Sequence, residues 1–291
     1  MSERLSRVLL AAPGIAWLVI LMVIPCLLVL ANSFFERGVY GGIDYVFTLG
    51  NYARAFDSLY LRVFLNSARI AATAAAIAVV IAYPVAFAIA RATPARQSAY
   101  LFLVMLPFWS NYLIRTYAWM VMLNPKGIVN NGLTGLGLPE LPLLYNEFAV
   151  IVGLVYNYTP FVVLAIFSAL GRVNREVIEA SEDLGASSFM TFRRVLLPLT
   201  VPGIATGFVF VFVLSIGNFI TPALLGGKRV QMVGNLVYDQ FLSARDWPFG
   251  SALAFILIGI MMVLLFAQAL LARRIETAGE RAEGARGGGD V

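Results

Sequence analysis

Residues 179–200 read EASEDLGASSFMTFRRVLLPLT, and this charged stretch lies between two of the most apolar runs of the chain. The chain has 291 residues, of which 60% are hydrophobic and only 13% are charged. Soluble domains average about 45–50% apolar and about 25% charged residues. The composition therefore indicates an integral membrane protein, in which residues 179–200 form a polar segment outside the hydrocarbon.

Four apolar segments precede this stretch and two follow it. Each is long enough to cross a bilayer, because a hydrocarbon core of about 30 Å needs about 20 helical residues. Lipid-exposed backbone has to satisfy its own hydrogen bonds, so each segment is expected to be a helix. The sequence thus predicts an all-α membrane protein with spans at about 8–30, 68–90, 100–123, 148–170, 203–226 and 250–272. The transmembrane domain is expected over 1–276, followed by a flexible, Gly-rich cytoplasmic tail over 277–291.

The lysines and arginines of the loops predict the orientation, because these residues are enriched on the cytoplasmic side. With a cytoplasmic N-terminus, the inside segments are 1–7, 91–99, 171–199 and 273–291. They hold twelve cations in about 65 positions, whereas the outside segments hold seven in about 84. Those outside segments are 31–67, 124–147 and 227–249. Both termini and the loop 171–200 are therefore expected in the cytoplasm.

The loop between the fourth and fifth spans has about 30 residues, whereas connections between packed helices commonly have 2–8. Apolar and small residues recur at three- and four-residue spacing through 177–188, which is typical of a short amphipathic helix. Gly185 is expected to end this helix. Ser187 or Ser188 is expected to cap a second short helix that runs to Leu196.

Two prolines follow this second helix. Pro198 and Pro202 are expected to stop it before the fifth span begins, because proline lacks the N–H of an interior helical residue. On these observations alone, a helix lying at the lipid headgroups fits as well as a helix that a partner protein contacts.

The same stretch resembles the cytoplasmic signature of ABC importer permeases. That signature is Glu-Ala-Ala, three residues, Gly, nine residues and Ile-x-Leu-Pro. Here it reads Glu179-Ala180-Ser181, Gly185 and Val195-Leu196-Leu197-Pro198, with Ser181 in place of Ala and Val195 in place of Ile. The resemblance implies a type I importer fold, with cytoplasmic coupling helices that dock on an ATP-hydrolysing subunit.

The resemblance also assigns residue roles. It implies ATPase coupling by Glu179, Ala180, Gly185, Leu197 and Pro198. In that reading Glu179 faces the ATPase, Gly185 makes the bend, and Leu197 with Pro198 seats the segment against the next span.

The chain itself contains no nucleotide-binding signature. A phosphate-binding loop needs Gly, four residues and Gly-Lys-Ser/Thr. The nearest approach, around Gly227-Lys228, has Pro222 in place of the first Gly and Arg229 in place of Ser/Thr. The chain also has no histidine, the commonest general base and metal ligand. We therefore expect no catalysis, no cofactor and no metal in this chain, with ATP and Mg²⁺ bound by the partner ATPase.

Polar side chains in a membrane are costly, so they mark either helix packing or a pathway. Asn111, Asn157 and Asn218 are expected near the middle of three successive spans, at one depth. The residues predicted to line a substrate path are Asn111, Tyr112, Arg115, Asn157, Tyr158, Asn218 and Thr221. The alternative is interhelical hydrogen bonding alone, worth roughly 0.6 kcal/mol per contact.

Three further features concern the spans. Arg115 is expected to face protein or water rather than lipid, and it is the ionisable residue that we identify within the six segments. Gly217 and Pro222 predict a break in the fifth span. Gly203 and Gly207 suit close helix packing.

Five more stretches resemble the spermidine/putrescine branch of these permeases: 106–109 (LPFW), 114–119 (IRTYAW), 124–130 (NPKGIVN), 221–227 (TPALLGG) and 246–250 (DWPFG). This implies a polyamine importer in a bacterial inner membrane. The implied partners are a second homologous permease, two ATP-binding subunits, a periplasmic substrate-binding protein and membrane lipid, with no nucleic acid.

The cargo stays open, because no Asp or Glu lies within the six predicted spans to meet a polycation. Another amine, an opine or a phosphonate is the alternative for the same machine. A self-contained secondary carrier is a further alternative, although a carrier commonly needs an ionisable relay in the membrane. A scaffold subunit without a transport path is the last.

Overall fold

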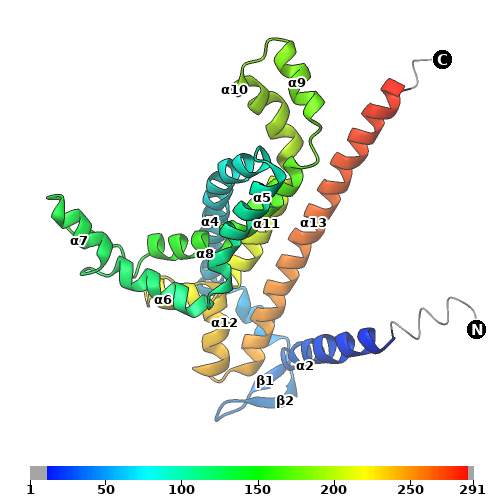
Figure 1. Ribbon diagram of the computed structural model, residues 1–291. Coiled ribbons are helices and arrows are strands. Elements are labelled where there is room, and N and C mark those ends of the chain that lie inside the picture. Colours follow the sequence, from blue (N-terminus) through cyan, green and yellow to red (C-terminus); the bar gives the residue numbers. More distant parts are fainter. Residues whose placement is uncertain (1–11, 288–291) are drawn as a thin grey trace, which may run out of the picture. The chain divides into compact units, whose positions relative to one another are not determined.

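The computed structural model describes residues 12–287, without the side chains of Arg175 and of residues 271–287 (Figure 1). Most of this part is helical. The helices are α2 (Ile24–Asn32), α3 (Gly50–Ala55), α4 (Ser58–Ala90), α5 (Pro94–Met105), α6 (Tyr112–Leu123), α7 (Ile128–Gly135), α8 (Glu147–Leu170), α9 (Arg175–Asp183), α10 (Ser188–Thr191), α11 (Leu197–Ile216), α12 (Val233–Leu242) and α13 (Trp247–Gly287). There are also one 3₁₀ turn, η2 (Leu106–Trp109), and three π-helical turns, η1 (Val19–Val23), η3 (Phe192–Leu196) and η4 (Pro222–Gly226). Residues 12–18 are helical as well and lead into η1.

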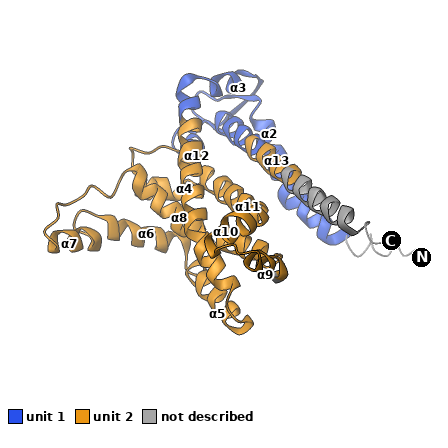
Figure 2. Cartoon of the chain, turned by 90° about the horizontal axis from the view of Figure 1, so that it is seen from above, with its two compact units in different colours: residues 1–62, 236–259 blue, residues 63–235, 260–291 orange. Residues whose placement is uncertain are grey.

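The chain divides into two compact units (Figure 2). The first unit comprises residues 1–62 and 236–259, and the second comprises 63–235 and 260–291. The boundaries fall within the residue ranges of α4, α12 and α13.

Five helices of the described part are long and apolar enough to cross a membrane, where the sequence predicts six spans. They are Ala12–Asn32, Ser58–Ala90, Glu147–Leu170, Ser188–Ile216 and Trp247–Leu270. The predicted third span, 100–123, is interrupted between α5 and α6. Each of these helices has 12 residues, which gives about 18 Å, well short of a bilayer core of about 30 Å. The third predicted span is therefore a broken segment rather than one helix.

The observed helix ends also differ from the predicted boundaries at α4 and at α13. The helix α4 starts at Ser58, ten residues before the predicted second span. Its 33 residues give a length of about 50 Å, which is well beyond the thickness of a hydrocarbon core. At the other end of the chain, α13 continues as far as Gly287, into the predicted tail 277–291. Its sequence there is rich in Ala, Glu and Arg, which are strong helix formers. The flexibility of that tail stays a prediction.

The second unit is built around close contacts between helix backbones. The buried face of α4 is largely a row of alanines, namely Ala71, Ala74, Ala75, Ala78, Ala82 and Ala86. A Cβ added to Gly203 of α11 would lie 2.4 Å from the Cβ of Ala169 on α8, and one added to Gly207 would lie 2.9 Å from Val162 Cγ1. The predicted packing role of Gly203 and Gly207 is confirmed, because only glycine allows α11 to approach α8 so closely.

The predicted break in the fifth span is confirmed. The helix α11 ends at Ile216, and a π-helical turn begins at Pro222. A Cβ on Gly234 would come within 2.6 Å of the carbonyl oxygens of Gly217 and Asn218, so the chain after the break returns tightly against it. Asn235 donates from Nδ2 to the Phe219 carbonyl at 2.8 Å. Side-chain and backbone contacts thus cover the irregular backbone, as the membrane interior requires.

The first unit contains a two-stranded hairpin that the all-α prediction misses. The strands β1 (Phe35–Arg37) and β2 (Ile43–Phe47) are antiparallel. The hairpin is tied to the chain before α13, since Arg37 donates to the Ala244 carbonyl at 2.7 Å and the Gly42 N–H donates to the Arg245 carbonyl at 2.9 Å.

A charged pair stabilises the same unit. Arg54 Nη1 lies 2.9 Å from Oδ2 of the buried Asp246, and the guanidinium lies 3.9 Å from the centre of the Phe249 ring. Burial acts to lower the pKa of Arg54, but hydrogen bonds to Tyr60 and Asp246 outweigh burial and raise the pKa above its usual value. The arginine therefore stays charged in this pair.

Candidate functional site

The segment 171–200 forms the bent pair of helices that the sequence predicts. Gly185 follows α9 with a φ of +82°, a left-handed conformation that glycine adopts without strain. Its N–H donates to the Glu182 carbonyl at 2.9 Å, and the Ala186 N–H donates to the Ser181 carbonyl at 3.1 Å. This pair of bonds is the Schellman motif, which satisfies the last carbonyls of a helix. Ser187 then caps α10 by accepting from the Met190 N–H at 3.3 Å.

The predicted stop at Pro198 and Pro202 is wrong. The chain is helical without interruption from Ser188 to Ile216, through α10, η3 and α11. The π-helical turn η3 comes directly before Leu197 and Pro198, and Pro202 lies inside α11. A wider turn changes the hydrogen-bond register ahead of the proline, so the helix accommodates Pro198 instead of ending there. The second short helix predicted for this segment and the helix α11 are therefore one continuous helix.

Exposed apolar side chains lie at the bend between α9 and α10. Leu184 is 89% exposed and Phe189 is 71% exposed, on either side of Gly185. Glu179 and Ala180 are also exposed, whereas Leu197 packs partly against the core. Large exposed apolar groups next to carboxylates are typical of a surface that contacts another protein or a membrane.

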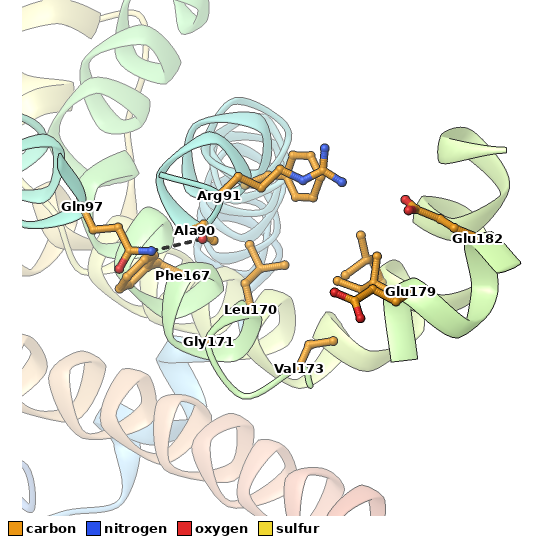
Figure 3. Close-up of a pocket in the computed structure, with 12 residues that line it drawn as sticks. Ala90, Arg91, Gln97, Phe167, Leu170, Gly171, Val173, Glu179 and Glu182 are labelled. Atoms are coloured by element: carbon orange, nitrogen blue, oxygen red, sulfur yellow. Dashed lines mark hydrogen bonds between the residues drawn. The ribbon is translucent and has the colours of Figure 1, made fainter. Parts of the chain in front are cut away.

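A pocket of about 650 Å³ lies beside α9 (Figure 3). It is lined by Glu179 and Glu182 of α9, by the ends of α4 and α8, and by Gln97 of α5. Arg91 extends from the end of α4 toward the two carboxylates, with its guanidinium 4.3 Å from the centre of the Phe87 ring. Gln97 donates from Nε2 to the Ala90 carbonyl at 3.1 Å and so fixes the turn after α4. The segment 171–200 thus borders the ends of two helices, α4 and α8, that are long and apolar enough to span a membrane.

Within the spans, four of the predicted path residues form one hydrogen-bonded cluster. Asn218 donates from Nδ2 to the Tyr112 hydroxyl at 2.6 Å and to the Tyr158 hydroxyl at 2.7 Å. Its Oδ1 accepts from the Thr221 N–H at 2.9 Å. Tyr112 and Thr221 also share a hydrogen bond of 2.5 Å between their hydroxyls. We call Tyr112, Tyr158, Asn218 and Thr221 the polar cluster; it joins the break before α6 to the break after α11.

The other two asparagines lie outside this cluster. Asn111 is exposed and caps α6, because its Oδ1 accepts from the Leu113 N–H at 2.8 Å. Asn157 is buried and donates to the Gly153 carbonyl at 2.9 Å within its own helix, while its Oδ1 lacks a partner among the described residues. The structure therefore joins Asn218 to tyrosines rather than to other asparagines, and a pathway role for any of these residues stays a prediction.

Arg115 faces protein, as expected. Its side chain is 7% exposed, and Nη1 donates to the Pro107 carbonyl in η2 at 2.9 Å. The guanidinium lies 5.4 Å from the centre of the Phe108 ring and 5.8 Å from that of Tyr112. Arg115 thus ties α6 back to the turn that interrupts the third span.

One ionisable pair escaped the sequence analysis. Arg69 lies within the predicted second span, and its Nη2 is 2.6 Å from Glu147 Oε2 at the start of α8. Arg115 is therefore not the single ionisable side chain of the predicted spans. An arginine in one apolar run and a glutamate at the start of another were the available signal.

Comparison with known proteins identifies the family. Residues 1–277 match the family described as the binding-protein-dependent transport system inner membrane component. The chain belongs to this family. It is a multi-pass inner membrane protein and a transmembrane permease subunit of an ABC importer, hence a transport subunit and not an enzyme.

Two relatives in sequence and one solved structure are similar to this chain. The spermidine/putrescine transport system permease protein PotB of Haemophilus influenzae is 42% identical over 267 residues, covering 90% of this chain and 93% of that protein. The corresponding PotC protein of Escherichia coli is 33% identical over 114 residues, 39% of this chain and 43% of that protein. A bacterial alginate ABC transporter, crystallised with its alginate-bound periplasmic protein, contains a chain with TM-score 0.76 and 18% identity, covering 94% and 97% of the two chains. That likeness shows the importer permease fold.

The polar cluster makes a prediction about stability. In a double-mutant cycle, Asn218→Ala and Tyr158→Phe should interact by about 0.6–1.7 kcal/mol, because each removes one partner of the same hydrogen bond. The measurement is the free energy of unfolding of the purified permease complex. Tyr156→Phe is the matched control, since Tyr156 lies on the same helix but its ring contacts Trp119. An interaction energy near zero for Tyr158 as well as for Tyr156 would contradict the cluster.

Proposed function

We propose that this chain forms half of the translocation path of an ATP-driven polyamine importer and receives its driving force through the segment 171–200. The observation that carries the coupling role is the bend at Gly185, which presents Leu184 and Phe189 to the outside of the chain. The proposed assembly contains a second homologous permease, two ATP-binding subunits that hold ATP and Mg²⁺, and a periplasmic substrate-binding protein. Both termini and the segment 171–200 lie in the cytoplasm.

The continuous helix from Ser188 to Ile216 supports the coupling role. A partner that pushes α10 acts on a helix that continues through η3 into α11 without a loop to absorb the motion. The helix α11 ends at the break that carries Asn218 and Thr221. A displacement at the ATPase therefore reaches the polar cluster along one helix.

The cargo proposal draws on the named relatives and on the chemistry of the cluster. The Haemophilus influenzae relative is a spermidine/putrescine permease. Tyrosine hydroxyls and ring faces, such as those of Tyr112 and Tyr158, suit amines through hydrogen bonds and cation–π contacts. Against a polycation, Arg115 is a buried positive charge beside Tyr112. That charge favours an opine or a phosphonate as the second candidate cargo.

Competition in transport distinguishes the two cargo classes. Proteoliposomes with the complete transporter and its binding protein should take up radiolabelled spermidine when ATP is present. Unlabelled putrescine should compete, whereas an opine and an alkylphosphonate at equal concentration should not. Uptake of the labelled opine or phosphonate in place of spermidine would contradict the polyamine proposal and leave the ABC importer assignment intact.

Gly185 tests the coupling role. Gly185→Pro replaces a residue whose φ of +82° proline cannot adopt, so the bend between α9 and α10 should be lost. The expected result is that ATP hydrolysis no longer responds to the loaded binding protein and that uptake falls to background.

The matched control is Gly137→Pro. Gly137 has a φ of +77° with open space around it, but it follows α7 on the opposite side of the membrane in the proposed orientation. Both variants impose the same kind of backbone strain, so a general folding defect would affect both. Equal loss of stimulated ATPase activity in the two variants, or full activity of Gly185→Pro, would contradict the coupling proposal.

A further inference from the structure

The π-helical turn η3 sets the rotation of the coupling helix α10 relative to the spanning helix α11. The Leu197 N–H donates to the Phe192 carbonyl, five residues earlier instead of four. A π-helical turn contains one residue more than an α-helical turn. Residues before the turn are therefore rotated by about 100° from the positions that a continuous α-helix would give them.

Pro198 accounts for the position of this turn. In a continuous α-helix a proline at 198 would crowd the carbonyl of Arg194 and offer it no N–H. The same spacing occurs once more in the described chain, where η1 is followed by Ile24 and Pro25. Proline alone does not produce the wide turn, since Pro202 lies inside α11 with α-helical residues before it. Pro198 thus favours the π register at the junction of the two helices.

The residues rotated by the turn make the contacts that hold the coupling segment in place. Thr191, the last residue of α10, is buried, and its Oγ1 lies 3.0 Å from Ser181 Oγ on α9. Phe192, the first residue of η3, packs edge to face on Tyr83 of α4, with ring centroids 5.4 Å apart. In an α-helical register neither side chain would point in its present direction.

Tyr83 also reaches across the turn. Its hydroxyl shares a buried hydrogen bond of 3.0 Å with Thr200 Oγ1 on α11. The ring of Tyr83 therefore meets the residue at the start of η3, and its hydroxyl meets a residue beyond the end of η3. This one side chain holds α4 to both sides of the turn.

We propose that Pro198 is a positioning residue for ATP-driven transport. It keeps η3 in the π register, which braces α10 against α9 and seats Phe192 on Tyr83, so that a push on the coupling helices moves α4 and α11 together. The inference rests on the proposed role of the segment 171–200 as the ATPase-coupling element. In this positioning role Pro198 contacts neither cargo nor ATP.

A cross-link reads the register directly, whatever the segment does. In the complete transporter with Cys26→Ser, the pair Ser181→Cys and Thr191→Cys should form a disulfide on oxidation with copper phenanthroline, because the native hydroxyl oxygens are 3.0 Å apart. Adding Pro198→Ala should abolish most of the cross-link, since residue 191 rotates away. Pro202→Ala, the matched control one helical turn later, should leave it unchanged. A cross-link that survives Pro198→Ala would overturn the register argument.

The functional readout is the amount of cargo taken up per ATP hydrolysed in proteoliposomes. The parent transporter for this measurement carries Cys26→Ser but neither Ser181→Cys nor Thr191→Cys. Pro198→Ala should lower this ratio several-fold while the complex still hydrolyses ATP, and Pro202→Ala should keep the ratio of the parent. An unchanged ratio for Pro198→Ala would overturn the proposal. If Gly185→Pro uncouples the transporter and Pro198→Ala does not, the coupling role stands and this inference fails.

A second variant keeps the test decisive if Pro198→Ala does not assemble with the ATPase. Tyr83→Leu leaves the sequence of the coupling segment intact and removes both contacts that span η3. It should lower the uptake per ATP and retain the Ser181–Thr191 cross-link. Tyr83→Phe, which keeps the ring on Phe192, should restore most of the ratio. A normal ratio in Tyr83→Leu would contradict the proposal.

Discussion

Close contact between α8 and α11 is the constraint on which the rest of the structure depends. Gly203 and Gly207 leave no space for a side chain between the two backbones, so α11 is seated along α8 over successive turns. Because α11 is continuous with α10 through η3, the same contact also fixes the direction of α10. In the proposed coupling role, this contact would let α11 carry a displacement of α10 toward the break after Ile216.

The backbone is broken at the opposite end of α11. The helix α11 ends where Gly217 and Pro222 interrupt it, and the third predicted span breaks between η2 and α6. In hydrocarbon such breaks persist only where protein groups satisfy the freed polar atoms. Asn218 does this with its bonds to two tyrosines and to the Thr221 N–H. The polar cluster is therefore a structural requirement of the breaks as well as the place where we expect cargo to pass.

Much of the fold and part of the site follow from the sequence. Apolar length predicts the spans, and local signals predict the bend at Gly185, the cap at Ser187 and the break at Gly217, because each depends on a few neighbouring residues. The interruption near Asn111 is not evident, since the composition of 100–123 is apolar on both sides of it. Likewise, the proline at 198 reads as a stop until the π-helical turn is seen. The partners of Asn218 depend on three-dimensional packing, which spacing along one chain does not determine.

The most direct test of the account is accumulation of cargo against a concentration gradient in liposomes that contain this chain and its partner permease, with and without the ATPase subunits. The sequence contains no phosphate-binding-loop signature, and the proposed coupling role makes transport depend on a partner. Accumulation is therefore predicted only when the ATPase subunits and ATP are present with the loaded binding protein. Accumulation of spermidine by the two permeases alone, without any nucleotide-hydrolysing subunit, would contradict it.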